Sequence, residues 1–174
     1  MFTKRMLAAS AVALVTLSVP ATAGGSPSGN IVAAAAASPD FETLVAAVKA
    51  AKLVDTLASK GPFTVFAPTD AAFAKIDSAT LQNLLKPENR DQLAKVLTYH
   101  VVPGRTSAAA LMAKIQADGG KTMLKTVQGE NLTAAVRDGA VWLTDAKGGM
   151  SKVTIADVNQ SNGVIHVVDT VLMP

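Results

Sequence analysis

The spacing of apolar residues changes once along this chain, near Gly104, and this change restricts the fold more than any other feature. Before it, apolar residues recur at intervals of three and four, as in Phe41, Leu44 and Val48, which predicts helices with one buried face. After it, apolar and polar residues alternate, which predicts strands. Helices that come early and antiparallel strands that come late favour an α+β fold over the alternating units of a parallel sheet.

The pattern also places the expected elements along the chain. Helices are expected after Ser38, over 52–58, after Thr69 or Asp70, near 81–85, over 91–99 and around 107–116. Strands are expected over 63–66, 121–127, 132–137, 140–144, 153–155 and 164–168. Asp138-Gly139 predicts a two-residue hairpin because the favoured turn needs positive φ at both positions. Asn162-Gly163 is expected to turn the chain into the last strand.

The first 23 residues have the pattern of an export signal. Lys4 and Arg5 give a positive start, residues 6–19 are apolar almost throughout, and Ala21-Thr22-Ala23 is the small-x-small pattern that signal peptidase accepts. A membrane anchor needs about 20 apolar residues, and this run is shorter. We therefore expect cleavage after Ala23, with no membrane span left, and a secreted, extracellular or periplasmic protein.

Residues 24–37 are rich in glycine, serine and alanine and are expected to form a flexible leader. The folded domain is then expected over residues 38–174, with Ser38 as the cap of its first helix and Pro39 at the first helical position. A domain of this length can bury one core.

Charge and composition exclude several classes of function. Without Lys4 and Arg5 the chain has 14 basic against 13 acidic residues, so the basic footprint of a nucleic-acid-binding protein is missing. The chain has one tryptophan, Trp142, and one tyrosine, Tyr99, and no basic residues are interleaved with them as in a surface that stacks on nucleic-acid bases. Both residues are therefore expected to serve in packing. The absence of cysteine excludes a disulfide scaffold, a thiolate metal site and a cysteine nucleophile.

Few residues are candidates for chemistry. His100 and His166 are the only imidazoles, and Asp169 is expected on the strand face opposite His166, so no metal site is predicted. A phosphate loop ending at Lys121-Thr122 fails because Ile115 stands where the motif needs glycine. No serine lies in a G-x-S-x-G motif and the carboxylates form no patterned cluster. The chain is therefore predicted not to be an enzyme and to need no cofactor.

Three segments, taken in order, resemble the fasciclin domain family. They are GPFTVFAPTDAAF at residues 61–73, Tyr99-His100-Val101-Val102, and NGVIHVVDTVLMP at residues 162–174. The resemblance covers essentially all of residues 38–174. It implies a compact wedge in which N-terminal helices pack on a mainly antiparallel sheet or sandwich.

Ten residues of these segments are assigned to the structural motif: Phe63, Thr64, Phe66, Pro68, Thr69, Asp70, Phe73, Asn162, Gly163 and His166. Pro68 is expected to end a strand, Thr69 or Asp70 to cap the next helix, and Phe73 to return to the core. Apolar residues on both faces of the last strand predict that it is covered on both sides. The buried His166 imidazole should then have a hydrogen-bond partner.

The resemblance implies a secreted or surface-attached adhesion module, as in the matrix proteins keratoepithelin and periostin. It implies two contact regions, Tyr99-His100 and Asp157-Val158; the family's glutamate and proline before the aspartate are replaced here by Ile155-Ala156. The alternative for Tyr99-His100 is packing, and for Asp157 a bond to local backbone amides. We expect His100→Ala to cost about 1–3 kcal/mol of stability. Asp157→Ala is expected to leave the fold nearly intact.

The expected partner is a cell-surface or matrix protein or glycan, and the chain is expected to be a monomer. Two other functions stay open. One is a carrier of a carotenoid- or lipid-like molecule in a pocket, and the other is a structural envelope protein with no specific ligand. The residues that could line a carrier pocket are Met112, Met123, Met150 and Met173.

Overall fold

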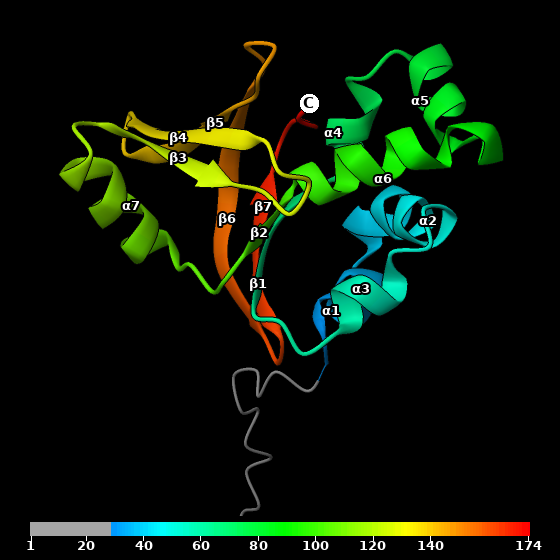
Figure 1. Cartoon of the computed structure of the whole chain (residues 1–174), viewed down its shortest axis with the longest axis horizontal. Helices are drawn as coiled ribbons and strands as arrows, with labels where there is room; N and C mark the ends of the chain where they lie inside the picture. The colour runs from blue at the N-terminus through cyan, green and yellow to red at the C-terminus, as the bar shows by residue number, and fades with distance from the viewer. Residues whose placement is uncertain (1–28) are drawn as a thin grey trace, which may run out of the picture.

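The computed structural model describes residues 29–174 (Figure 1). Its helices are α1 Ile31–Ala37, α2 Glu42–Ala50, α3 Val54–Ala58, α4 Asp70–Ala74, α5 Ser78–Leu85, α6 Arg90–Tyr99 and α7 Ala108–Ala117, with short 3₁₀ turns at Pro39–Phe41 and Pro87–Asn89. Its strands are β1 Phe63–Pro68, β2 Val101–Pro103, β3 Lys121–Lys125, β4 Asn131–Arg137, β5 Ala140–Thr144, β6 Met150–Gln160 and β7 Gly163–Val168.

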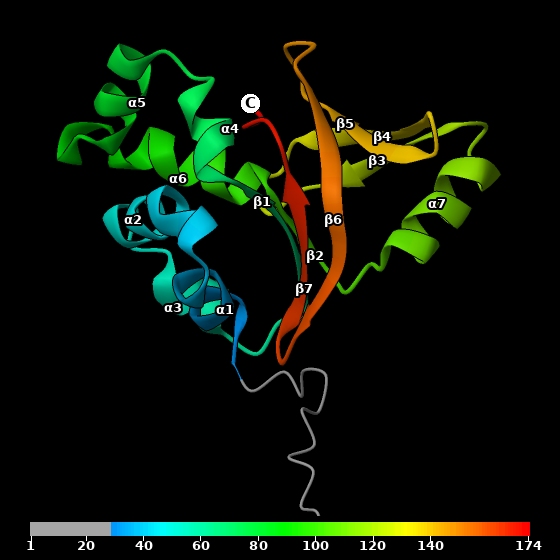
Figure 2. The same cartoon turned by 180° about the vertical axis from the view of Figure 1, so that it is seen from behind.

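The strands form one seven-stranded sheet in the order β2-β1-β7-β6-β5-β4-β3. Only the β1–β7 pair is parallel among these described strands. Helices α1 to α6 gather beside β1 and β7, and α7 lies apart from them beside β3 and β4 (Figures 1 and 2). The α+β fold class with a mainly antiparallel sheet is therefore confirmed.

Two buried apolar clusters lie on opposite faces of the central strands. The helix-side cluster contains Val65 of β1 and Ile165 of β7. The sheet-side cluster contains Phe66 and Val168 of the same two strands. All six residues of β7 are buried, as the apolar residues on both of its faces predicted.

Residues 31–37 are not a flexible leader, because they form helix α1 and pack against the domain. The Asn30 side chain caps this helix by accepting from Ala33 N at 2.8 Å, and Ile31 and Ala35 are buried. The composition of residues 24–37 predicted a leader because glycine, serine, proline and alanine offer little to pack, but alanine also has the highest helix propensity. The expected signal peptide and residues 24–28 lie outside the described residues.

Strand β6 is much longer than the expected 153–155, because irregularities in its pairing with β7 break the period-two pattern. The register shifts between Val153 and Ile155 and again between Ile155 and Val158. The turn into β7 also falls one residue earlier than expected, at Ser161-Asn162. Gly163 already belongs to β7, and a Cβ there would collide with the carbonyl oxygen of Phe63.

The Asp138-Gly139 hairpin is confirmed, with φ of 52° and 74° at its two positions. Ser38 precedes the first 3₁₀ turn as expected but does not cap it, because its hydroxyl donates to Ala34 O. Between residues 29 and 174, no single helix has the length and apolarity of a membrane span; α1 and residues 39–50 pass that test only as a pair, bent by 109°.

Candidate functional site

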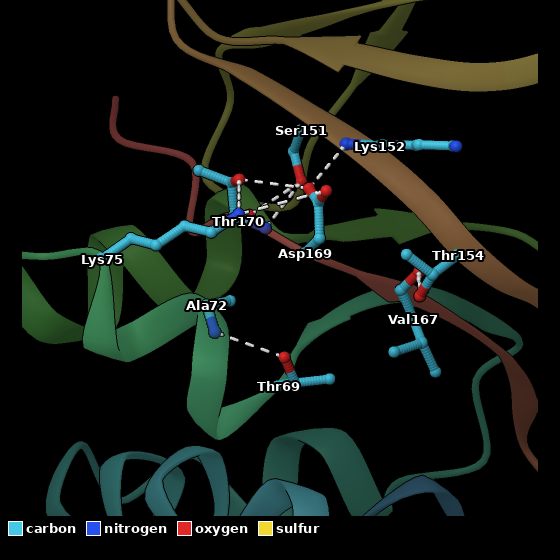
Figure 3. Close-up of polar contacts among 9 residues, drawn as sticks. All are labelled: Thr69, Ala72, Lys75, Ser151, Lys152, Thr154, Val167, Asp169 and Thr170. Carbon is cyan, nitrogen blue, oxygen red and sulfur yellow. Dashed lines mark hydrogen bonds and ion pairs between the residues drawn. The ribbon is translucent and has the colours of Figure 1, made fainter.

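The first fasciclin-like segment is a strand that turns sharply into a helix. Strand β1 ends at Pro68, and the Thr69 hydroxyl accepts from Ala72 N at 3.2 Å, which caps α4 (Figure 3). Asp70 is not the cap; its carboxylate accepts from Thr43 N at 2.8 Å and so ties α4 to α2. Phe73 is buried in the helix-side cluster. These residues therefore hold the helices to the sheet.

Two further polar residues of the motif connect distant parts of the chain. The Thr64 hydroxyl donates to Gly104 O at 2.7 Å and accepts from Thr106 N at 2.9 Å. The Asn162 side chain accepts from Ile31 N at 2.9 Å and donates to Leu57 O at 2.7 Å and to Ser59 O at 2.9 Å. Asn162 thus joins α1 and α3 to the β6–β7 turn.

The Tyr99-His100 pair is buried. Tyr99 Oη donates to Asn131 O and accepts from Ala146 N, both at 3.2 Å, and burial raises the pKa of its phenol. His100 Nε2 accepts from Leu172 N at 2.9 Å, so Nδ1 carries the proton and donates to Val96 O at 2.8 Å. Burial lowers the pKa of His100 to about 4. These contacts favour the packing role over direct contact with a receptor.

The buried His166 ring has the hydrogen-bond partners that were expected for it. Its Nε2–H donates to Thr106 O at 2.8 Å, and its Nδ1 accepts from Asp157 N at 3.3 Å. The ring stacks on Phe66 with a centroid separation of 5.5 Å. Both imidazoles are therefore held between backbone groups and serve as bridges within the fold.

Asp157 lies exposed at an irregularity of β6 with φ of 59°, and Val158 beside it is half-buried against the helix-side cluster. The Asp157 carboxylate accepts a hydrogen bond of 2.7 Å from the backbone N–H of Ala108, which is the first residue of α7. The bond is to an amide 49 residues away, whereas a local amide was expected. Asp157→Ala is therefore expected to destabilise the protein by about 1–2 kcal/mol, because it removes this acceptor and because alanine tolerates positive φ less well than aspartate.

Asp169 belongs to a polar seam between the end of β7, β6 and α4 (Figure 3). Its Oδ1 accepts from Lys152 N at 2.9 Å and from the Thr170 hydroxyl at 3.1 Å, and its Oδ2 lies 4.0 Å from Lys75 Nζ. Ser151 Oγ donates to Thr170 O at 2.8 Å in the same seam. Over residues 29–174, no three His, Asp or Glu side chains are placed to hold a metal ion.

The four methionines of the carrier hypothesis do not share a pocket. Met123 is 67% exposed on β3, and Met112 of α7, Met150 of β6 and Met173 of the C-terminal segment are half-buried. The apolar cavity between α1, α2, α6 and β1 has a volume of about 30 Å³. Ligand pockets measure about 300–1,000 Å³, so this cavity is too small for a carotenoid or a lipid tail.

The fold and the motif define a class of protein: an α+β domain in which a helix-backed, mainly antiparallel sheet is held by buried histidine, threonine and asparagine bridges. The chain belongs to the Fasciclin domain family, whose model matches residues 39–174. The resemblance seen in the sequence is thereby confirmed. Members of this family are often cell-adhesion or extracellular proteins and are generally non-enzymatic adhesion or structural modules.

Individual relatives agree with this assignment. The chain is 50% identical over 145 residues to Protein sll1483 of Synechocystis sp., covering 83% of this chain and 73% of the relative. It is 33% identical over 161 residues to Cell surface glycolipoprotein MPB83 of Mycobacterium bovis, covering 89% and 65%. A solved FAS1 domain pair from the insect cell adhesion molecule Fasciclin I matches with a TM-score of 0.76 at 19% identity, covering 85% of this chain and 52% of that one.

Proposed function

We propose that this protein is an exported, monomeric fasciclin domain that binds a cell-surface or matrix partner and performs no catalysis. Export is proposed to follow cleavage after Ala23, with no membrane span left in the mature chain. The observation that carries the proposal is that the polar side chains of the fasciclin motif bond to backbone groups of other parts of the domain. Because these side chains are used in hydrogen bonds within the domain, a partner must bind to other residues, which are exposed on the surface.

Asp157 with Val158 is the proposed contact region of this surface. The Asp157 residue is exposed on β6, whereas Tyr99 and His100 are 0% and 2% exposed. A carboxylate in this position can coordinate a cation that a partner holds. The relative named as a cell surface glycolipoprotein supports a partner of this location.

The proposal is tested by attachment of cells and of matrix-coated beads to the immobilised protein. Asp157→Asn keeps an acceptor for Ala108 N and tolerates positive φ, so it removes only the charge. We expect attachment to fall about tenfold while the melting temperature stays unchanged. Asp138→Asn is the matched control, because Asp138 is also an exposed aspartate at positive φ, in the β4–β5 turn.

Two outcomes would contradict the proposal at different levels. Full attachment of the Asp157→Asn variant removes Asp157 from the contact and leaves the binding function in place. No attachment of the unmodified protein to any cell or matrix surface overturns the binding function itself.

A further inference from the structure

The four strands β3 to β6 have one buried face and one open face. Residues of the inner face, such as Leu132 and Leu143, belong to the sheet-side cluster, and α7 covers them with Leu111. The alternate residues point to the other side, which is here called the outer sheet face. It consists of Lys121, Met123, Lys125, Asn131, Thr133, Ala135, Arg137, Ala140, Trp142, Thr144, Met150 and Lys152.

No described helix covers the outer sheet face. In Figure 1 helix α7 lies below β3 and β4, and helices α1 to α6 lie on the other side of the molecule. Five of its residues are exposed: Lys121, Met123, Lys125, Arg137 and Lys152. In contrast, Thr122, Leu124 and Ser151, their neighbours on β3 and β6, are buried.

The outer sheet face is positively charged. It carries four cations, and its strands direct no carboxylate to that side. The nearest carboxylates along the chain, Glu130 and Asp138, lie in the turns at the two ends of β4. Among residues 29–174 the one ion pair is Lys75–Asp169, so these four cations are not neutralised by an ion pair. Figure 3 shows the Lys152 side chain directed away from the Asp169 carboxylate.

Trp142, the single tryptophan of the chain, lies near the middle of the outer sheet face. It stands in one row with Lys121, Ala135 and Lys152 across four strands. Lys121 and Lys152 are therefore three strand spacings apart, about 14 Å. Cations separated by this distance, with an aromatic ring between them, suit an extended anionic chain better than a single small anion.

The indole of Trp142 also lacks a hydrogen-bond acceptor. Its Nε1 is the one buried side-chain nitrogen or oxygen without a partner in the described part of the chain. A buried donor without a partner is costly, so such a group calls for an explanation. Arg137 of β4 reaches Met150 of β6 with an Nη1–Sδ distance of 3.8 Å, and this contact crosses over β5, the strand of Trp142. Movement of these two flexible side chains would open the indole to an acceptor from a ligand.

We propose that the outer sheet face binds an acidic polysaccharide, with one sugar ring over Trp142 and its carboxylate or sulfate groups at the lysines and Arg137. Charged hydrogen bonds from lysine and arginine suit such groups, and the indole offers an apolar surface with a polar edge. The hydroxyls of Thr133 and Thr144, in the adjacent row, can bond sugar hydroxyls. The inference rests on the proposed function, since it names one surface and one partner class for it.

A single-stranded nucleic acid is the weaker candidate for the same face. Such strands are bound through several stacked bases, whereas the outer sheet face has one aromatic residue. The sequence pattern did not indicate this face, because its cations and its tryptophan are neighbours across strands and are separated along the chain.

The test is a titration of the purified protein with heparin, alginate and neutral dextran, followed by Trp142 fluorescence and by retention on a heparin column. We expect heparin or alginate to change the fluorescence, dextran to leave it unchanged, and affinity to fall as salt increases. Lys121→Ala/Lys152→Ala should weaken binding at least about tenfold. Lys49→Ala/Lys95→Ala is the matched control, because it removes two exposed lysines from α2 and α6.

Each contrary result has a separate meaning. Equal loss in the two double variants, or no binding of any acidic polysaccharide, overturns the proposal. Equally tight binding of single-stranded DNA or of anionic lipid vesicles through the same lysines overturns the assignment to a polysaccharide. If polysaccharide binding fails while cells still attach, the outer sheet face is rejected and the proposed function stands. If polysaccharide binds and cells do not attach, the outer sheet face is kept as a polysaccharide site and the proposed function in cell attachment is rejected.

Discussion

His100 connects helix α6 to the C-terminal segment as a neutral imidazole. One ring nitrogen donates to Val96 O within the helix, and the other accepts from Leu172 N. Both bonds are buried, and the accepting nitrogen cannot take a proton without losing the Leu172 bond. The protonation of this one residue is therefore linked to the packing of the C-terminal segment.

This linkage predicts an acid-dependent loss of stability. The pKa of His100 is lowered from 6.5 to about 4 in the folded protein, so the unfolded chain binds a proton first as the pH falls. Protonation of His100 should therefore leave the free energy of unfolding unchanged above pH 6.5. It should lower this free energy by about 3 kcal/mol as the pH falls to 4. Urea unfolding of the unmodified protein and of His100→Gln between pH 7 and 4.5 measures the difference. Parallel pH curves for the two proteins would contradict it.

Sequence patterns found the motif residues but not all of their bonds. Burial of His166 followed from the apolar faces of its strand, and the packing alternative for Tyr99-His100 followed from the apolar face of its helix. The bond from Ala108 N to Asp157 and the three bonds of Asn162 join residues far apart in sequence. No local pattern encodes these partners, because they are brought together only by the completed fold.

At the scale of elements, alternation predicted β3, β4 and β5 well and β6 poorly. The first three strands alternate between buried and less buried residues, except at the half-buried Val136, whereas two register shifts interrupt β6. The parallel pairing of β1 with β7 could not be predicted either. Apolar residues on both faces of β7 indicate a central strand and do not name its neighbour.

The sequence analysis missed helix α1 as well as the short strand β2, and the contacts of α1 predict a measurable contribution to stability. A chain that begins at residue 38 loses the burial of Ile31 and leaves Asn162 Oδ1 without its donor. We expect the free energy of unfolding to fall by about 3 kcal/mol relative to a chain that begins at residue 24. Urea unfolding compares the two chains, with Ala36→Ser on the exposed side of α1 as the control. Equal stability of the two chains would mean that α1 is not part of the folded unit.

At the scale of the whole molecule, the two buried clusters are not independent. Successive residues of β1 alternate between them, with Val65 in the helix-side cluster and Phe66 in the sheet-side cluster. Ile165 and Val168 divide β7 in the same way. Because β1 and β7 contribute residues to both clusters, disruption of one cluster also disturbs the packing of the other.

Because β1 and β7 are shared by both clusters, we predict that the described domain unfolds as one cooperative unit. Trp142 fluorescence reports the sheet side and circular dichroism at 222 nm reports mainly the helices, so the two urea transitions should coincide. Leu44→Ala in the helix-side cluster and Leu132→Ala in the sheet-side cluster should each cost about 2–5 kcal/mol. Each variant should move both transitions to the same lower midpoint. If Leu132→Ala shifts the fluorescence transition and leaves the helical signal in place, the two sides unfold separately and the central strands do not couple them.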